Sequence, residues 1–139
     1  MDMKNFSLAG VRVLLVDDEK DALAVTRLML ELHGAEVITA PAAAEGLKKV
    51  QTHTPDVIVS DIGMPQMDGY QFMRAIRRLP EHKGGNTPAL ALTAFTRPED
   101  REKALDAGFL AHLPKPVLLQ QLITEVMTIL NSTRLLKKI

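Results

Sequence analysis

The sequence contains no cysteine and no tryptophan, and aromatic residues make up only 4% of its 139 positions. Without cysteine, disulfide bonds, thiolate nucleophiles and cysteine-ligated zinc or iron–sulfur centres are excluded. The absence also fits a reducing compartment, so we expect a cytoplasmic location. Long apolar runs are lacking too, since aliphatic stretches such as Val13–Val16 are far too short to cross a membrane. The first ten residues show no basic start followed by an apolar stretch, so no signal peptide is expected.

The sequence also lacks an excess of charge of either sign. Seventeen basic residues balance seventeen acidic ones, and the isoelectric point is near 6.9. Because a domain that grips nucleic-acid phosphates is normally basic, direct nucleic-acid binding is not expected. Hydrophobic residues at 46% and charged residues at 24% are typical of a globular domain. The length fits one domain: we predict a lead-in at 1–9, the domain at 10–130, and at 131–139 a tail that is a linker remnant or an extension of the last helix.

Short apolar runs alternate five times with longer patterns of helical period, which predicts an α/β fold of the (βα)5 type. The predicted strands are 11–17, 36–40, 57–60, 89–92 and 111–113. The predicted helices are 20–32, 41–51 with Pro41 as a first helical residue, 70–79, 96–108 with a capping box at 96–99, and 118–130. Near-continuous apolar runs in three of the strands indicate a parallel sheet covered on both faces. We expect a doubly wound five-stranded sheet with the flavodoxin-like strand order 2-1-3-4-5.

Chemically active residues follow the predicted strands. Asp17 and Asp18 end the first strand, Asp61 the third and Thr93 the fourth, and Lys115 follows the fifth. In the expected strand order these side chains converge at one edge, where ligands of such sheets bind. Three carboxylates that meet repel one another, and Mg²⁺ would relieve that repulsion. A lysine and a hydroxyl facing the metal indicate an anion, so the pattern predicts a phosphoryl-transfer site with an aspartate nucleophile.

Each of these residues alone has an ordinary structural explanation. Asp17 or Asp18 can cap a helix, and Asp61 can belong to a turn. Thr93 is a common strand residue, and Lys115 alone would be read as a solvated surface side chain. The joint occurrence of all five at carboxyl ends of predicted strands favours the functional interpretation.

Five motifs carry a family resemblance over about residues 10–130. In order along the chain they are VLLVDDEKDA (13–22), DIGMPQMDGY (61–70), ALTAF (91–95), EDREKALDAGF (99–109) and HLPKPV (112–117). Together they resemble the receiver domain of two-component response regulators. The lead-in before the first strand and the last two motifs resemble receivers attached to hybrid histidine kinases; the alternative is a stand-alone single-domain response regulator.

The resemblance implies a regulatory phosphoacceptor domain rather than an enzyme, although such a domain assists its own phosphorylation and dephosphorylation. Asp61 matches the residue that accepts a phosphoryl group from a phosphohistidine of a histidine kinase or histidine phosphotransfer protein. Asp17 and Asp18 match the acidic pair that holds Mg²⁺ together with Asp61, with Asp18 the favoured direct ligand. Gly63 matches the position whose backbone carbonyl also binds the metal.

The resemblance also implies a switch. Thr93 matches the switch hydroxyl and Lys115 the family's lysine, and Pro116 matches a proline preceded by a cis peptide bond. Phosphorylation would change the surface of the fourth helix, fifth strand and fifth helix, which would then contact a downstream protein or output domain, or a second copy in a homodimer. His112 departs from the family, because tyrosine or phenylalanine usually occupies this switch position.

Two further departures concern hydrolysis of the acyl phosphate. Gly63 has no side chain, and Phe95, two residues after Thr93, has no polar one. We expect neither residue to orient a hydrolytic water, so the acyl phosphate should be long-lived.

Other functions fit the residues less well. An aspartyl-phosphate phosphatase usually carries a second acid two residues after its nucleophile, where this chain has Gly63. A flavin or nucleotide binder should show a glycine- or hydroxyl-rich loop after the first strand, but Asp17-Asp18-Glu19 would repel phosphate there. An interaction module without phosphorylation would tolerate the loss of Asp61, which is present.

Overall fold

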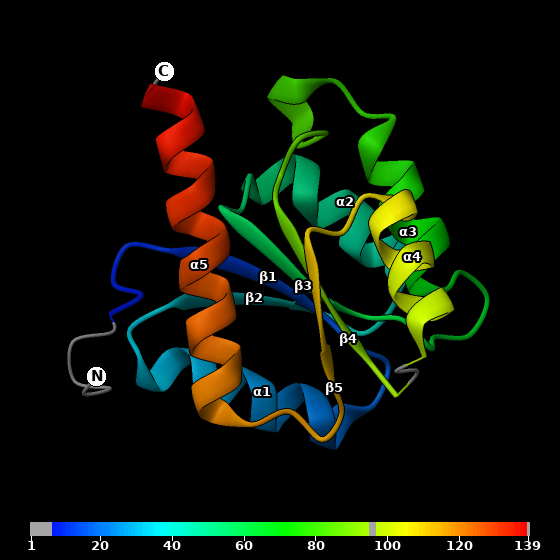
Figure 1. Ribbon diagram of the computed structural model, residues 1–139, viewed down its shortest axis with the longest axis horizontal. Helices are drawn as coiled ribbons and strands as arrows, with labels where there is room; N and C mark the ends of the chain where they lie inside the picture. The colour runs from blue at the N-terminus through cyan, green and yellow to red at the C-terminus, as the bar shows by residue number, and fades with distance from the viewer. Residues whose placement is uncertain (1–6, 95–96, 139) are drawn as a thin grey trace.

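The computed structural model describes residues 7–94 and 97–138, which form one five-stranded parallel sheet with helices on both faces (Figure 1). The strands are β1 (Arg12–Val16), β2 (Glu36–Ala40), β3 (Val57–Asp61), β4 (Ala89–Thr93) and β5 (Ala111–Pro114). The helices are α1 (Lys20–Leu32), α2 (Ala43–His53), α3 (Gly69–Arg77), the short 3-10 helix η2 (Glu81–Lys83), α4 (Pro98–Ala107) and α5 (Leu119–Lys138). The order β2-β1-β3-β4-β5 confirms the predicted topology.

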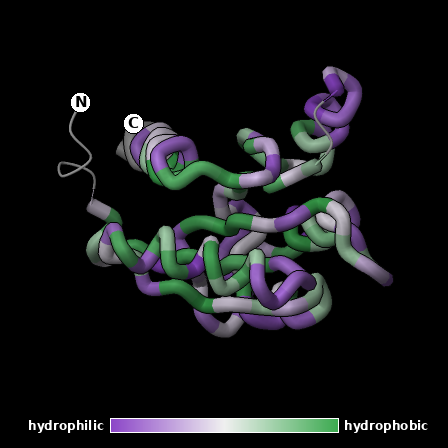
Figure 2. Tube along the Cα trace, turned by 90° about the horizontal axis from the view of Figure 1, so that it is seen from below, coloured by the Kyte–Doolittle hydropathy of each residue, from purple (hydrophilic) through white to green (hydrophobic). Residues whose placement is uncertain are grey.

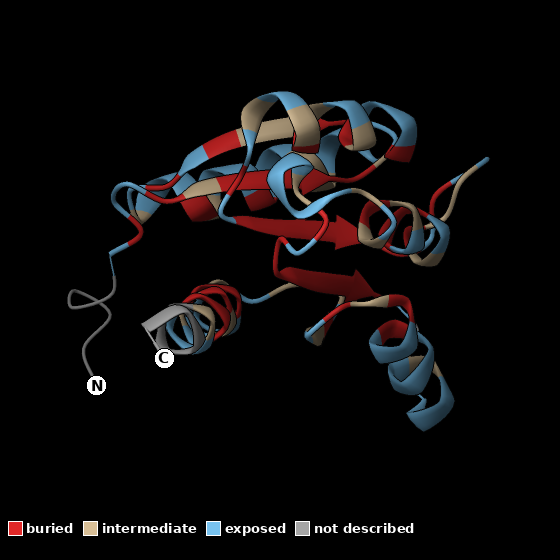
Figure 3. Ribbon diagram, turned by 90° about the horizontal axis from the view of Figure 1, so that it is seen from above, coloured by how far each residue is buried: buried red, intermediate tan, exposed pale blue. Residues whose placement is uncertain are grey.

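Alternate side chains of the strands pack against two separate helical layers. On one face, Val13 and Leu15 of β1 join a buried cluster with residues of α1 and α5. On the other face, Leu14 and Val16 join a cluster with residues of α2, α3 and α4. Figure 3 shows the buried strands between these two layers, and Figure 2 shows hydrophilic and hydrophobic positions alternating along the helices. Burial on both faces explains why the strands read as apolar runs.

The starts of α2 and α4 differ from the prediction. Pro41 is not a helical residue: α2 begins at Ala43, after Ala42 in an extended conformation. The predicted capping box includes Thr96, which lies outside the described residues. The helix α4 itself begins at Pro98, and Asp100 accepts a hydrogen bond from the Arg97 N–H at 3.3 Å.

The last helix is longer than its predicted core. It begins at Leu119 and continues to Lys138, so residues 131–138 extend α5. Within the described ranges, no helix combines the length and apolar character needed to cross a bilayer.

The start of α3 is packed tightly against the end of β3. A Cβ atom at Gly69 would lie 2.5 Å from the Asp61 carbonyl oxygen, so this position requires glycine. The Gly69 N–H donates to the Ile62 carbonyl at 2.8 Å. Asp68 caps the helix by accepting from the Gln71 N–H at 2.8 Å. These contacts hold the segment that follows Asp61 in place.

Candidate functional site

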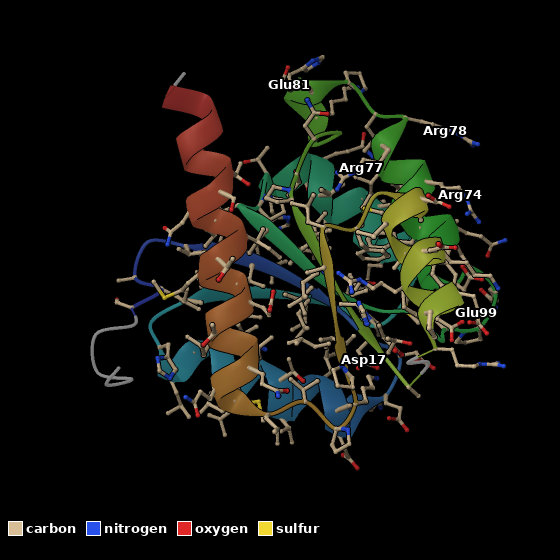
Figure 4. All side chains as sticks on the ribbon, viewed as in Figure 1. Asp17, Arg74, Arg77, Arg78, Glu81 and Glu99 are labelled. Carbon is tan, nitrogen blue, oxygen red and sulfur yellow. The ribbon has the colours of Figure 1, made fainter. Side chains whose placement is uncertain are left out.

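The predicted site residues lie at the carboxyl edge of the sheet. Asp17 directly follows β1, Asp61 and Thr93 are the last residues of β3 and β4, and Lys115 directly follows β5. Asp17, Asp61 and Thr93 are only 1%, 6% and 4% exposed. Figure 4 marks Asp17 where the ends of the central strands meet. Parallel strands bring these positions together because their carboxyl ends share one edge of the sheet.

Three carboxylates share a small volume at this edge. One oxygen each from Asp17, Asp18 and Asp61 lies within 4.8 Å of the other two. Asp18 is the least buried of the three. One oxygen of Asp17 is held by the adjacent backbone, since Asp17 Oδ1 accepts the Glu19 N–H at 3.0 Å. The prediction that these acids converge is therefore confirmed as geometry.

A lysine ammonium bridges two of the carboxylates. Lys115 Nζ lies 3.2 Å from Asp17 Oδ2 and 3.1 Å from Asp61 Oδ1. The Lys115–Pro116 peptide bond is cis, as the resemblance implied. With one cation among three acids, the cluster retains two uncompensated negative charges when all are ionised.

Burial and charge act on these groups in opposite directions. Burial raises the pKa of Asp61, and Asp17 and Asp18 raise it further, while the hydrogen bond and attraction of Lys115 lower it. For Lys115, burial opposes the charged form, but the hydrogen bond to Asp61 and the attraction of both acids raise its pKa overall. The ammonium is thus held charged, and Asp61 is a more basic carboxylate than usual.

The donor set fits a hard divalent cation. Mg²⁺ prefers oxygen ligands and usually keeps several waters, which a cluster at the rim of the sheet allows. The carboxylates of Asp17, Asp18 and Asp61 are suitable ligands. The backbone carbonyl of Gly63, an exposed residue two positions after Asp61, is a fourth candidate.

The two predicted switch residues differ in position. Thr93 belongs to the site: its carbonyl accepts the Lys115 N–H at 2.9 Å. His112 does not join the carboxylates. It pairs with Ala91 in the middle of β5 and lines a surface pocket together with Arg101 and Leu105 of α4 and Glu125 of α5.

One feature of the site was not anticipated from the sequence. A groove of about 490 Å³ beside Lys115 is lined by Val25 and Met29 of α1 and by Pro116 and Val117. Val25 is 53% exposed, which is high for an aliphatic side chain. The i, i+4 spacing of Val25 and Met29 was a visible signal, but it is equally typical of residues that face a core.

Comparisons with known proteins agree in family and fold. The sequence profile of the response regulator receiver domain matches residues 13–127. An uncharacterized 14.6 kDa protein of Leptolyngbya boryana is 46% identical over 111 residues, which cover 80% of this chain and 83% of that protein. The transcriptional regulatory protein PrrA of Mycobacterium tuberculosis is 39% identical over 120 residues, 86% of this chain but 50% of PrrA, so the chain spans about half the length of that relative.

Solved structures show the same likeness. The chemotaxis protein CheY4 of Vibrio cholerae superposes with a TM-score of 0.81 at 34% sequence identity. The match covers 87% of this chain and 99% of the CheY4 chain.

Proposed function

The chain belongs to the response regulator receiver domain family, a family of regulatory phosphoacceptor domains, and on that premise we propose that Asp61 accepts a phosphoryl group from a partner's phosphohistidine. One observation carries the assignment. Asp61 is buried at the sheet edge, in contact with Lys115 at 3.1 Å and beside two further carboxylates. Burying an acid beside two further carboxylates lowers the stability of the fold. Acids in such unfavourable surroundings are typical of functional sites.

The side chains support a defined transfer. Lys115 contacts Oδ1 of Asp61, so Oδ2 is the oxygen that attacks phosphorus. The new O–P bond forms as the P–N bond to the donor imidazole breaks, and the electron pair of that bond leaves with the imidazole nitrogen. Lys115 Nζ and the Thr93 hydroxyl then stabilise negative charge on the phosphoryl oxygens. Mg²⁺ held by Asp17, Asp18, Asp61 and the Gly63 carbonyl would supply the remaining positive charge.

The decisive experiment is intact mass after incubation with acetyl phosphate. Wild type is compared with Asp61→Asn, and with Asp106→Asn as a matched control, because Asp106 is exposed on α4. Each protein is incubated with Mg²⁺ or with chelator. We expect the gain of one phosphoryl group in wild type and in the control, only with Mg²⁺, and none in Asp61→Asn. Equal labelling of Asp61→Asn would refute the assignment.

The apolar groove beside Lys115 supports a proposal about the donor. A histidine kinase or histidine phosphotransfer protein must cover the surface around Asp61 to deliver its phosphoryl group. The groove shares Lys115 with the site, and exposed Leu28 and Leu32, at 58% and 68%, continue the apolar face along α1. We therefore place part of the donor contact on α1.

The donor contact is tested by Val25→Glu, with Leu105→Glu as control, because Leu105 is similarly exposed at 47% on α4. Transfer from a phosphorylated histidine kinase that loads the wild type should fall in Val25→Glu alone. Loading by acetyl phosphate should be unchanged in both variants. Equal transfer to both variants would contradict a donor contact on α1.

We further propose that phosphorylation changes the surface of α4, β5 and α5, with Thr93 and His112 as switch residues. His112, Arg101 and Leu105 lie together on that surface. The altered surface would contact a downstream protein or output domain, or form a homodimer. Light scattering with and without beryllofluoride, a mimic of the phosphoryl group, distinguishes the homodimer from contact with another protein.

The parent protein is a separate proposal. The lead-in before β1 and the motifs at 99–109 and 112–117 favour a receiver from a hybrid histidine kinase. The alternative, a stand-alone regulator, is supported by the match to most of a 14.6 kDa relative. An immunoblot of the native protein decides: a band near 15.3 kDa supports the alternative, and a much larger one supports the hybrid kinase. The cytoplasmic location and the domain boundaries stay predictions.

A further inference from the structure

Arg77, the last residue of α3, joins three carbonyl groups from separate parts of the chain. Its Nη1 donates to the carbonyl oxygens of Gly85 at 3.0 Å and Thr87 at 2.7 Å, both in the segment before β4. Its Nε and Nη2 donate to the Gly108 carbonyl at 3.2 and 2.7 Å. Gly108 is the C-cap of α4. One side chain therefore ties the end of α4 to the segment that precedes β4.

The surroundings of Arg77 differ from those of its basic neighbours. Arg74 and Arg78 are exposed, whereas Arg77 is only partly accessible and points inward in Figure 4. Across residues 7–94 and 97–138, no carboxylate lies within ion-pair distance of Arg77. Burial lowers the pKa of its guanidinium. A cation in such a place is costly unless it is well hydrogen bonded, so its four bonds indicate a positional role.

The C-terminus of α4 has a particular need for this cation. Unpaired carbonyl groups give a helix C-terminus partial negative charge, which a basic side chain in the last turn usually offsets. The last turn of α4 contains no basic residue and carries Asp106 instead. Arg77 supplies the positive charge from α3.

Position 108 is shaped for the same contact. Gly108 has φ of +118°, in the region that favours glycine. A Cβ atom there would lie 2.7 Å from Arg77 Nε and 2.8 Å from Arg77 Cγ. Glycine is therefore required both by the backbone and by the close approach of the guanidinium.

The rest of α4 is held unevenly. Its two buried residues, Ala104 and Ala107, both lie in the C-terminal half and have small side chains. In the N-terminal half, 98–103, only Asp100 is partly covered and the other side chains are exposed. Figure 4 shows the two ends: Arg77 lies beside the C-terminus of α4, and Glu99 lies at the end nearer the candidate site.

We propose that Arg77 is a positioning residue that anchors the C-terminus of α4, so that a displacement at Thr93 turns the helix about this end. The N-terminal half would move, and Arg101 would move with it on the surface that also carries His112. The pivot rests on the proposed function, because the displacement follows phosphorylation. The anchor itself rests only on the contacts of Arg77.

Hydrogen exchange measured by mass spectrometry tests both parts. Arg77→Met keeps the apolar stem and removes the donors, and Arg77→Lys keeps the charge but cannot span three carbonyls. Arg78→Met, on the adjacent exposed residue, is the matched control. The informative amides are those of Gly108 and Phe109, which donate to the Ala104 carbonyl at 3.2 and 3.0 Å.

In the unloaded protein, we expect exchange at these two amides to accelerate on the order of tenfold in Arg77→Met, because hydrogen bonds to a charged group are lost. A smaller acceleration is expected in Arg77→Lys, which serves alone if Arg77→Met does not fold. Exchange in β3 (Val57–Asp61) should be unchanged, which separates local release from general destabilisation. Equal exchange at 108–109 in Arg77→Met and Arg78→Met, or a uniform acceleration throughout the protein, would overturn the anchor.

With Mg²⁺ and beryllofluoride, the wild-type response should be concentrated in residues 98–103. In Arg77→Met it should spread into 104–109. The same distribution in both proteins would overturn the pivot. If wild type neither responds to beryllofluoride nor takes up a phosphoryl group, both the proposed function and the pivot are refuted. The comparison of Arg77→Met with Arg78→Met in the unloaded protein still tests the anchor.

Discussion

Replacing Asp61 with asparagine should stabilise the protein when no metal is present. The substitution keeps the shape of the side chain and an oxygen that can accept from Lys115, and it removes one buried negative charge. The substitution removes the attraction between the Asp61 carboxylate and Lys115 at 3.1 Å. It also removes the repulsion of that carboxylate by Asp17 and Asp18, whose oxygens lie within 4.8 Å. The raised pKa of Asp61 has burial as its largest cause, so the carboxylate form is disfavoured in the folded state.

The magnitude follows from the distances. At an effective dielectric constant of about 20, a repulsion across 4.8 Å, the upper limit of the separations in the cluster, costs about 3.5 kcal/mol, and the attraction at 3.1 Å contributes about 5 kcal/mol. Two repulsions and one attraction leave the ionised Asp61 unfavourable by about 2 kcal/mol. Solvent around Asp18 reduces this penalty, and burial of Asp61 increases it. We expect Asp61→Asn to raise the free energy of unfolding by about 1–2 kcal/mol, or Tm by about 3–8 °C.

The effect should depend on pH and on Mg²⁺. Because the folded-state pKa of Asp61 is raised above its ordinary value of 3.8, the destabilisation is fully present above the folded-state pKa. It is lost as the pH falls through that pKa toward 3.8, so the two proteins should converge in acid. Mg²⁺ at ten times its Kd would stabilise the wild type by about 1.4 kcal/mol and so reduce the difference at neutral pH.

The assay is urea denaturation in chelator at pH 7, repeated in acid and with Mg²⁺. Glu102→Gln is the control, because it removes one exposed negative charge from α4 and should change stability by less than about 0.5 kcal/mol. An Asp61→Asn protein no more stable than the wild type in chelator would refute the electrostatic reasoning.

Three further predictions concern other residues of the chain. Lys115→Gln removes the ammonium between two carboxylates, so calorimetry should show tighter Mg²⁺ binding. The rate of loading by acetyl phosphate should fall on the order of a hundredfold, and an unchanged rate would exclude a role of Lys115 in phosphoryl transfer. Because Gly63 has no side chain to orient water, the acyl phosphate should persist for minutes after the donor is removed, and decay within seconds by intact mass would contradict this. Gly108→Ala should destabilise the protein by about 1–3 kcal/mol in urea, clearly more than Gly10→Ala, where a Cβ meets nothing within 4 Å.

The alternation of strands and helices could be predicted because both faces of the sheet are covered, which leaves apolar runs such as Val57–Val59 in the sequence. The convergence of Asp17, Asp61 and Thr93 could be predicted because each lies at the end of a strand, and parallel strands end at one edge. The start of α2 could not. Local preference favoured Pro41, but the helix begins where Ala43 and Gly46 pack, and a Cβ at Gly46 would already touch Phe72.

Contacts that depend on the tertiary structure left no readable signal. Arg77 belongs to a run of basic positions on an amphipathic helix, where arginine is usually solvated. Its carbonyl partners include Gly108, which is 31 residues away in sequence. His112 illustrates the same limit: the sequence placed it three residues before Lys115, yet only the fold shows that it lines a pocket with Glu125 of α5.

The uninterrupted course of α5 to Lys138 has a consequence for anything joined to it. An α-helix has about 3.6 residues per turn, so each residue inserted after position 138 would rotate an attached domain by about 100° and shift it by about 1.5 Å. The register of such a junction, rather than its length alone, would determine which side of the attached domain faces the α4–β5–α5 surface. A series of fusions that differ by single residues should therefore show a periodic rather than a monotonic dependence of the output on linker length.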